Sequence, residues 1–146
     1  MKLRLWQVDA FTNKRFAGNP AAVVPLEQWL DDAVLQDIAA ENNLSETAFF
    51  VATDSGYHLR WFTPAMEVPL CGHATLASAA VVFAHLQPHA HRIEFVSKSG
   101  PLVGTREGAK YALDFQDYSC DRLDVPQSLQ EALGPETNEA RREPHM

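Results

Sequence analysis

The sequence predicts a mixed α+β domain in which mostly antiparallel strands enclose a buried central helix. Short apolar or alternating segments are separated by turns rich in Gly, Asn, Pro and Ser, a pattern typical of strands. Apolar residues recur at helical spacing over residues 32–42, which indicates a first helix. The segment ATLASAAVVFAHL, residues 74–86, is apolar or small on every side until His85. A helix with no face for solvent has to be wrapped by other elements, and this one is too short to span a bilayer.

The N-terminal third is expected to hold two strands and the first helix. A loose alternation over residues 3–9 predicts the first strand, and the apolar run 21–24 predicts the second. The Gly-Asn-Pro composition of residues 16–20 marks a turn between them. Asp31 and Asp32 are suited to the N-cap and first turn of the helix that follows.

The rest of the chain supplies the other strands. An aromatic-rich pair of segments is joined by the hairpin turn Asp54-Ser55-Gly56. Three further segments are separated by Ser-Gly-Pro and Glu-Gly turns after the wrapped helix. The five expected strands cover residues 47–52, 57–62, 93–96, 102–105 and 111–115.

Composition and charge limit the class of protein. The chain has 146 residues, 46% of them hydrophobic, which is ample for one domain with a core. A formal net charge of −7 argues against nucleic acid and against an anionic membrane surface as partners. Cys71 and Cys120 lie far apart without a CxxC partner, so neither a disulfide framework nor a zinc ribbon is indicated. The N-terminus lacks the apolar stretch of a signal peptide and no 18-residue apolar run occurs, so we expect a cytoplasmic protein.

The stretch LCGHAT, residues 70–75, stands at the start of the wrapped helix. A helix start offers unpaired backbone N–H groups and the positive end of a dipole, so it can bind a carboxylate, and Gly72 leaves room for close approach. Cys71 in this position would have a lowered pKa and could act as a thiolate base or nucleophile. The alternative is that Cys71 is a small buried apolar residue and His73 a partly exposed cap, and for the triplet alone this alternative is the better one.

Two carboxylates are candidates for the same pocket. Glu46 follows Ser45 at a strand entrance with Phe49 and Phe50 just beyond, and removal from water there would suit general acid/base work. Taken alone, a Glu at a strand end is more often solvated than catalytic. Glu67 lies in a proline-flanked loop and is a candidate for the pocket rim.

Three imidazoles lie at and just after the end of the wrapped helix, at His85, His89 and His91. They could bind a metal, but Pro88 breaks the local geometry and no acid or thiol completes a ligand set. We therefore expect a solvated loop there and no metal site.

Three phrases in the chain carry a family resemblance. VDAFTNKRFAGNPAAVV, NLSETAFF and RWFTPAMEVPLCGHATLASA, with the Val-Val that soon follows, strongly resemble the N-terminal half of the phenazine-biosynthesis PhzF-like family, which shares the diaminopimelate epimerase fold. The resemblance is clear from Val8 to Ala84 and continues weakly to Phe115. It implies a domain of mostly antiparallel strands curled round a central helix, the arrangement that composition also predicts.

The resemblance also implies a chemistry and a set of site residues. Glu46 looks like the acid/base of a cofactor-independent isomerase that moves a proton on a small carboxylate-bearing substrate. Gly72 and His73 look like the helix-start residues that bind substrate, and Ser45 like a neighbour that orients it. Cys71 falls where related epimerases keep a catalytic thiol, so it is kept as a secondary candidate.

The chain departs from the family in its length. We expect an N-terminal epimerase-like domain over residues 1–116, followed over 117–146 by the start of an inter-domain segment and a disordered or truncated tail. The second domain that should face Glu46 is missing, so two copies could pair as a homodimer. The alternative is a truncated half that binds a small carboxylate without turnover, or that only self-associates.

Overall fold

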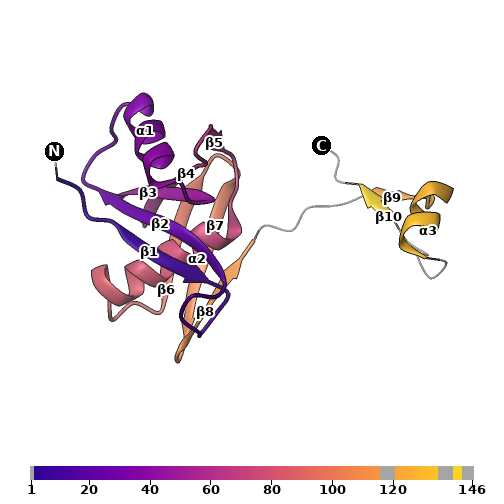
Figure 1. Cartoon of the computed structure of the whole chain (residues 1–146). Coiled ribbons are helices and arrows are strands. Elements are labelled where there is room, and N and C mark those ends of the chain that lie inside the picture. The colour runs from indigo at the N-terminus through magenta and orange to yellow at the C-terminus, as the bar shows by residue number, and fades with distance from the viewer. Residues whose placement is uncertain (1, 116–120, 135–139, 143–146) are drawn as a thin grey trace. The chain divides into compact units, whose positions relative to one another are not determined.

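The computed structural model describes residues 2–115, 121–134 and 140–142. The chain divides into two compact units, Met1–Phe115 and Gln116–Met146, which are treated separately below (Figure 1). The first unit holds every candidate residue named above except Cys120.

The first unit is built on one eight-stranded sheet. Its strands follow the order β1-β2-β3-β4-β6-β7-β8, and β5 pairs with β4 outside this path. Most neighbours are antiparallel, as the sequence predicts. The strands are β1 (Trp6–Ala10), β2 (Asn19–Leu26), β3 (Glu46–Ala52), β4 (Tyr57–Phe62), β5 (Glu67–Val68), β6 (Arg92–Ser97), β7 (Gly100–Glu107) and β8 (Lys110–Asp114).

Two pairings in this sheet are parallel, namely β2 with β3 and β4 with β6. Parallel neighbours need a crossover between them. Helix α1 (Asp32–Asn42) provides the first crossover, and the central helix lies in the connection from β4 to β6. Each helix is therefore placed by the parallel pair that it connects.

The first strand begins later than the alternation predicts, at Trp6. In its register with β2, Trp6 lies opposite Val23, and the last residues of β2 pair with β3 alone. Leu3 packs instead against the apolar cluster under α1. Leu3 therefore serves packing under α1 and not strand pairing, whereas Leu5 is exposed.

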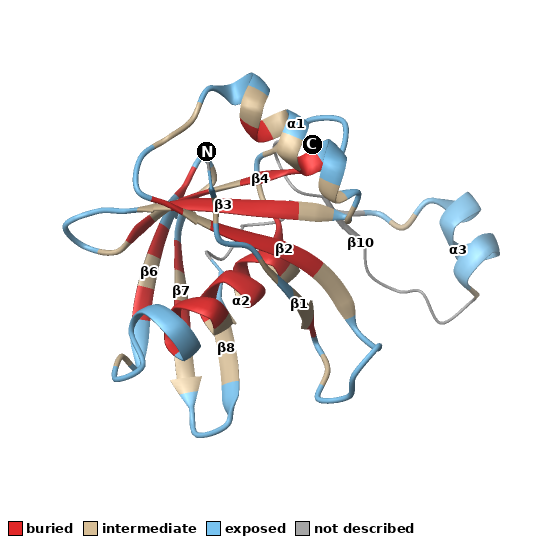
Figure 2. Cartoon of the chain, turned by 60° about the vertical axis from the view of Figure 1, so that its left-hand side comes forward, coloured by how far each residue is buried: buried red, intermediate tan, exposed pale blue. Residues whose placement is uncertain are grey.

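The central helix is wrapped by the sheet, which confirms the main prediction from composition. It consists of α2 (Gly72–Val81) and a final π-helical turn, η1 (Val82–Leu86). It contacts β1, β2, β3, β7 and β8, and Figure 2 shows its buried residues inside the curve of the sheet. Close packing needs small side chains: a Cβ at Gly104 of β7 would lie 3.1 Å from Cβ of Ala79.

Helix α1 covers the opposite face of the sheet, over β3 and β4. Its bounds agree with the prediction, and the left-handed Asn43 (φ 50°) ends it. Leu35 and Ala39 are buried there against Phe49 and Phe62. The sheet therefore separates two apolar clusters, and only the one around α2 borders the candidate site.

The second unit contains β9 (Asp121–Leu123), α3 (Gln127–Leu133) and β10 (Ala140–Arg142). β9 and β10 pair antiparallel. These elements lie within the segment that we expect to be an inter-domain start and tail; residues 116–120, 135–139 and 143–146 lie outside the described residues, as does Cys120. Among the helices described, none has the length and apolar character to cross a membrane.

Candidate active site

Because side chains alternate along a strand, the side chain of Glu46 lies on the face of β3 that packs against the central helix. Side chains of Glu46, Ala48 and Phe50 share one face of β3, and Ala48 and Phe50 belong to the cluster around α2. Phe49, on the other face, belongs to the cluster under α1. Only 18% of the Glu46 side chain is exposed. Glu46 is thus a largely buried carboxyl group on the concave side of the sheet.

The segment before Glu46 is fixed by the end of α1. Nδ2 of Asn42 donates a hydrogen bond to Oγ1 of Thr47 over 3.1 Å, which ties the last residue of α1 to the second residue of β3. Ser45 is exposed in the bend between them. Glu46 itself lies opposite Ala21 of β2 in the parallel pair. The position of Glu46 is therefore fixed by its pairing with β2 and by the Asn42–Thr47 hydrogen bond next to it.

The start of α2 supplies the other two side chains of the cluster. Cys71 is the N-cap and is buried, and the backbone N–H of Thr75 donates to its carbonyl over 3.2 Å to close the first turn. The Thr75 hydroxyl donates to the same carbonyl over 2.6 Å. His73 is the second residue of the helix, and 10% of its side chain is exposed.

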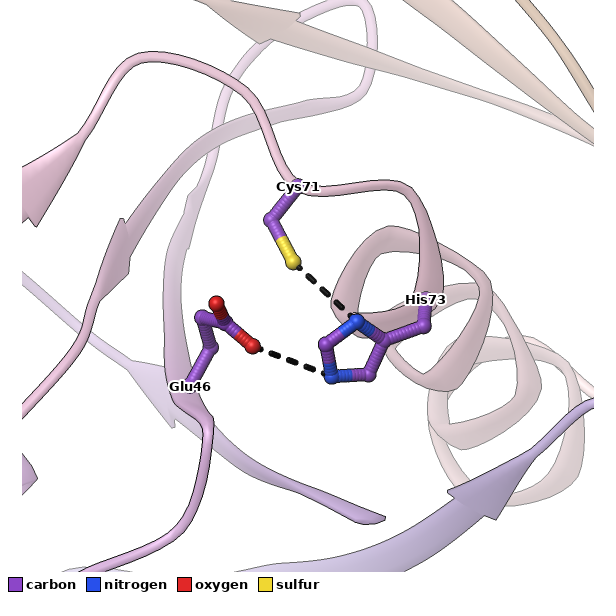
Figure 3. Close-up of side chains that lie close together, drawn as sticks. All are labelled: Glu46, Cys71 and His73. Atoms are coloured by element: carbon purple, nitrogen blue, oxygen red, sulfur yellow. Dashed lines mark hydrogen bonds and ion pairs between the residues drawn. The ribbon is translucent and has the colours of Figure 1, made fainter. Parts of the chain in front are cut away.

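Glu46, Cys71 and His73 form a contiguous cluster (Figure 3). Oε2 of Glu46 lies 3.1 Å from Nε2 of His73, and Nδ1 of the same ring lies 3.4 Å from Sγ of Cys71. The first distance is that of an ion pair, but the orientation is not that of a hydrogen bond, and both atoms are buried without a hydrogen-bond partner among the described residues. Unsatisfied buried polar atoms are costly, so their presence at one place favours a ligand that would pair with them.

A third such atom lies on the same face of the sheet. Nε1 of Trp61 is buried without a hydrogen-bond partner in the part of the chain described. Trp61 lies opposite Ala48 in the β3–β4 pair, so its indole belongs to the α2 side. All three orphaned atoms therefore belong to the concave side of the sheet.

The thiol of Cys71 is not activated as the helix-start argument expects. Burial raises the pKa of Cys71 to about 11, and the nearby Glu46 carboxylate adds to the rise. The backbone N–H groups of Ala74 and His73 act in the opposite direction but are outweighed. The expectation of a lowered pKa is therefore wrong, because desolvation exceeds the effect of the helix start.

The same three side chains are the one set of close metal-ligating groups among the described residues, with ligand atoms within 4.8 Å of one another. Zinc ligands stand about 2.0–2.3 Å from the ion. Here the thiol and the carboxylate contact opposite nitrogens of one imidazole, so a single ion cannot take all three ligands in this arrangement. The donor set does not fit a metal without rearrangement.

The start of α2 is also flanked by an aromatic ring that the sequence did not indicate. A Cβ at Gly72 would lie 3.1 Å from Cζ of Phe115, the residue that follows β8. Phe115 is 47% exposed. It lies 43 positions from Gly72 along the chain, and only the β7–β8 hairpin and its packing on α2 bring the two together.

Glu67 belongs to a different network. Its carboxylate accepts two hydrogen bonds from Arg60, at 2.8 and 3.0 Å, and another from Lys98. These partners, with the Arg60 guanidinium first, lower the pKa of Glu67 to about 2. Arg60 also pairs with Asp32 at 2.9 Å. Glu67 lies opposite Phe62 of the cluster under α1, so its side chain is on the α1 face of the sheet and not on the face of Glu46.

The three histidines at and after the end of the central helix are apart from the cluster. His85 lies in η1 and not in a loop as expected, whereas His89 and His91 follow the helix. His85 stacks on Trp6 with 5.4 Å between ring centroids, and His89 and His91 are exposed. Two surface cavities, of about 600 and 550 Å³, are likewise lined by other residues, the first including Trp6 and Leu86 and the second Tyr57. The candidate site is thus the buried polar cluster at the start of α2.

Comparison with known proteins agrees with this architecture. A family model described as phenazine biosynthesis-like protein matches residues 8–136. An uncharacterized isomerase of Pseudomonas aeruginosa is 53% identical over 134 residues, which cover 92% of this chain and 52% of that protein.

Solved structures give the same result. The crystal structure of a PhzF-family phenazine biosynthesis protein from Enterococcus faecalis matches with a TM-score of 0.80 and 48% identity, covering 90% of this chain and 51% of that one. A predicted epimerase from Pseudomonas aeruginosa, 24% identical with a TM-score of 0.74, shares the fold.

These matches settle the family and its fold. The chain spans about half the length of the curated relatives it matches. Its first unit is an α+β domain of the diaminopimelate epimerase type, and relatives bear the name isomerase. The chain belongs to the phenazine biosynthesis-like protein family.

Proposed function

We propose that this chain carries the Glu46 side of a cofactor-independent isomerase site acting on a small carboxylate-bearing substrate. The observation that carries the proposal is the pair of orphaned buried atoms, Oε2 of Glu46 and Nε2 of His73, beside the start of α2. A substrate placed there would meet one proton-transfer group and one ring nitrogen at the same point.

Each part of the cluster has a role in this proposal. The first N–H groups of α2, from Gly72 onward, bind the substrate carboxylate, since they lie at the positive end of the helix dipole. Glu46 takes a proton from a substrate carbon and returns it at another position, so the reaction is balanced without an external reagent. His73 binds the substrate beside Glu46. Ser45, exposed in the preceding bend, orients the substrate.

The facing wall of the site would come from a second copy of the chain. Glu46 and His73 are shielded mainly by their own unit, and closure over substrate needs a further surface. Phe11 and Phe16 in the β1–β2 loop are 72% and 99% exposed, and both have positive φ, at 62° and 63°. Exposed aromatic side chains on a strained loop are suited to an interface. The proposal therefore includes a homodimer in the cytoplasm.

A second candidate function is binding without turnover. It needs only the helix start that this chain carries, where a carboxylate could be held at Gly72 and His73 without proton transfer by Glu46. A self-associating half with no ligand is the remaining alternative. Phenazine chemistry is one of several chemistries open to the family, since fold does not determine substrate.

Deuterium exchange tests the catalytic proposal. The chain would be incubated in D₂O with a panel of small amino, hydroxy and unsaturated carboxylates, and deuterium uptake at carbon followed by mass spectrometry. We expect exchange with at least one compound, and a fall of about 100-fold or more in Glu46→Gln, since general acid/base groups contribute about 10²–10⁴. Glu107→Gln, at an exposed Glu at the end of β7, is the matched control and should exchange normally.

Two further measurements separate the alternatives. Molecular mass in solution should be that of a dimer, and a strict monomer that still exchanges deuterium would refute the shared site. Ligand-induced stabilisation that is unchanged in Glu46→Gln, without any exchange in the parent chain, would support binding alone. No stabilisation with any carboxylate would leave the inert half as the correct description.

A further inference from the structure

The imidazole of His73 has one side-chain neighbour at each ring nitrogen. Nδ1 faces Sγ of Cys71 at 3.4 Å and Nε2 faces Oε2 of Glu46 at 3.1 Å (Figure 3). Cys71 and His73 are held by the same helix start, whereas Glu46 comes from β3. The ring is therefore placed between two groups whose chemistry decides where its proton resides.

The carboxylate favours a proton on Nε2. A neutral imidazole has one N–H donor and one acceptor nitrogen, and an ionised carboxylate only accepts. A proton on Nε2 is therefore attracted to Glu46, whereas a bare Nε2 would leave two electron-rich atoms 3.1 Å apart. With Nε2 protonated, Nδ1 becomes an acceptor and needs a donor.

Among the described residues, the side-chain donor that contacts Nδ1 is the S–H of Cys71. We propose that Cys71 is a positioning residue, whose thiol donates to Nδ1 of His73 and so holds the ring with its Nε2–H beside Glu46, ready to donate to the substrate. In this arrangement the S–H of Cys71 donates a hydrogen bond to Nδ1 of His73. The N–H at Nε2 of the same ring then points to the space between Glu46 and the helix start. This gives Cys71 a role that is neither nucleophile nor base.

The opposite proton order is disfavoured by the surroundings of the sulfur. A thiolate accepting from Nδ1–H would be a buried negative charge next to the Glu46 carboxylate, and these two features raise the pKa of Cys71 to about 11. In the described part of the chain, Glu46 on β3 and His73 on α2 are the titratable groups that face the thiol. Near neutral pH the sulfur therefore keeps its proton.

This inference rests on the proposed function only in one respect, namely that a substrate accepts the hydrogen bond from Nε2–H. The proton order itself can be measured in the free chain. If the proton of His73 is not on Nε2, the proposal for Glu46 is unaffected. If the chain does not bind carboxylates, the assignment of the His73 proton to Nε2 is unaffected.

Nitrogen-15 NMR of the histidine rings tests the inference, at mildly alkaline pH where a free imidazole is neutral. We expect the parent chain to show His73 as the Nε2–H form with a hydrogen-bonded Nδ1. Cys71→Ala should move the Nδ1 resonance to that of an acceptor without a donor, and Cys71→Ser, which retains a donor, should restore it. The ring of His58, which packs edge-on against Trp29, is an internal control and should not move.

Two results would overturn the inference. One is a doubly protonated or Nδ1–H ring of His73 in the parent chain, because Nδ1 could then not accept a hydrogen bond from the thiol of Cys71. The other is an unmoved Nδ1 resonance in Cys71→Ala that folds as the parent does. If Cys71→Ala does not fold, the ring form in the parent chain and in Cys71→Ser still decides, because both keep a donor group.

Discussion

Replacing Gly72 by Ala should separate the stability of the first unit from its ability to bind a carboxylate. Gly72 is the first residue of α2, and a Cβ there would lie 3.1 Å from Cζ of Phe115. Phe115 is 47% exposed at the end of its unit, so its ring can move by a few tenths of an ångström. Ala is better than Gly in a helix by about 1 kcal/mol. The net change in unfolding free energy is therefore between about 0 and +1 kcal/mol, and the melting temperature should rise by no more than about 5 °C.

Binding should change in the other direction. In the proposed binding mode, a methyl group at Gly72 would occupy the space through which a carboxylate approaches the first N–H groups of α2. Loss of one charge-assisted hydrogen bond costs about 1.5–3 kcal/mol, which is a weakening of about 10- to 150-fold. Acetate and benzoate would be titrated into the chain while the backbone amide resonances of His73 and Ala74 are followed by NMR.

Gly104→Ala is the matched control for this experiment. Its Cβ would lie 3.1 Å from Cβ of Ala79 and 3.2 Å from Cγ1 of Ile93, both in the buried cluster around α2. Overpacking of this kind costs about 1–3 kcal/mol, so stability should fall while the folded protein binds as before. Unchanged carboxylate binding in Gly72→Ala, or equal loss in Gly104→Ala, would refute the helix start as the anion site.

Two predictions concern the stability of the first unit. The pKa of Glu67 lies at about 2 in the folded chain against an ordinary value of 4.5, so its ion pairs stabilise the fold above about pH 4.5, and this contribution is lost as the pH falls towards 2. After solvent screening, we expect the ion pairs of Glu67 to contribute about 1–2 kcal/mol to the free energy of unfolding. Urea unfolding as a function of pH should show the loss of this contribution in the parent chain but not in Glu67→Gln. The same dependence on pH in Glu67→Gln would contradict the assignment. Leu35→Ala should cost about 2–5 kcal/mol, because Leu35 is fully buried between α1 and the sheet; a loss under 1 kcal/mol in chemical denaturation would mean that this cluster contributes little.

Much of the fold could be predicted because its signals are local. Helix α1 has an acidic first turn, apolar spacing and an Asn pair at its end, and the structure gives it the predicted bounds. The wrapped helix was evident from the uninterrupted small and apolar residues of α2. Strand direction was harder: β2 and β3 are parallel because α1 crosses between them, a consequence of order along the chain that apolar patterning does not contain.

The site could be predicted only in part. Family resemblance indicates Glu46, Gly72 and His73 as candidates, and the structure brings Glu46 and His73 to within 3.1 Å. The direction of the pKa shift of Cys71 was missed, because the helix start is visible in the sequence whereas the burial that outweighs it is not. Phe115 was missed as well, since its contact with Gly72 depends on how the β7–β8 hairpin packs on α2.

The parallel pairing of β2 with β3 has a consequence for how the site is assembled during folding. Glu46 pairs with Ala21, and the 24 residues between them include helix α1. The start of α2 is held by strands from both ends of the unit. Closing such non-local contacts is slow compared with forming a hairpin such as β7–β8. We therefore expect the hairpins and helices to appear first in a refolding experiment, and the amide at Glu46 to gain protection from hydrogen exchange only with the whole sheet. The Glu46 carboxyl group would then remain outside its apolar surroundings until the last cooperative step of folding.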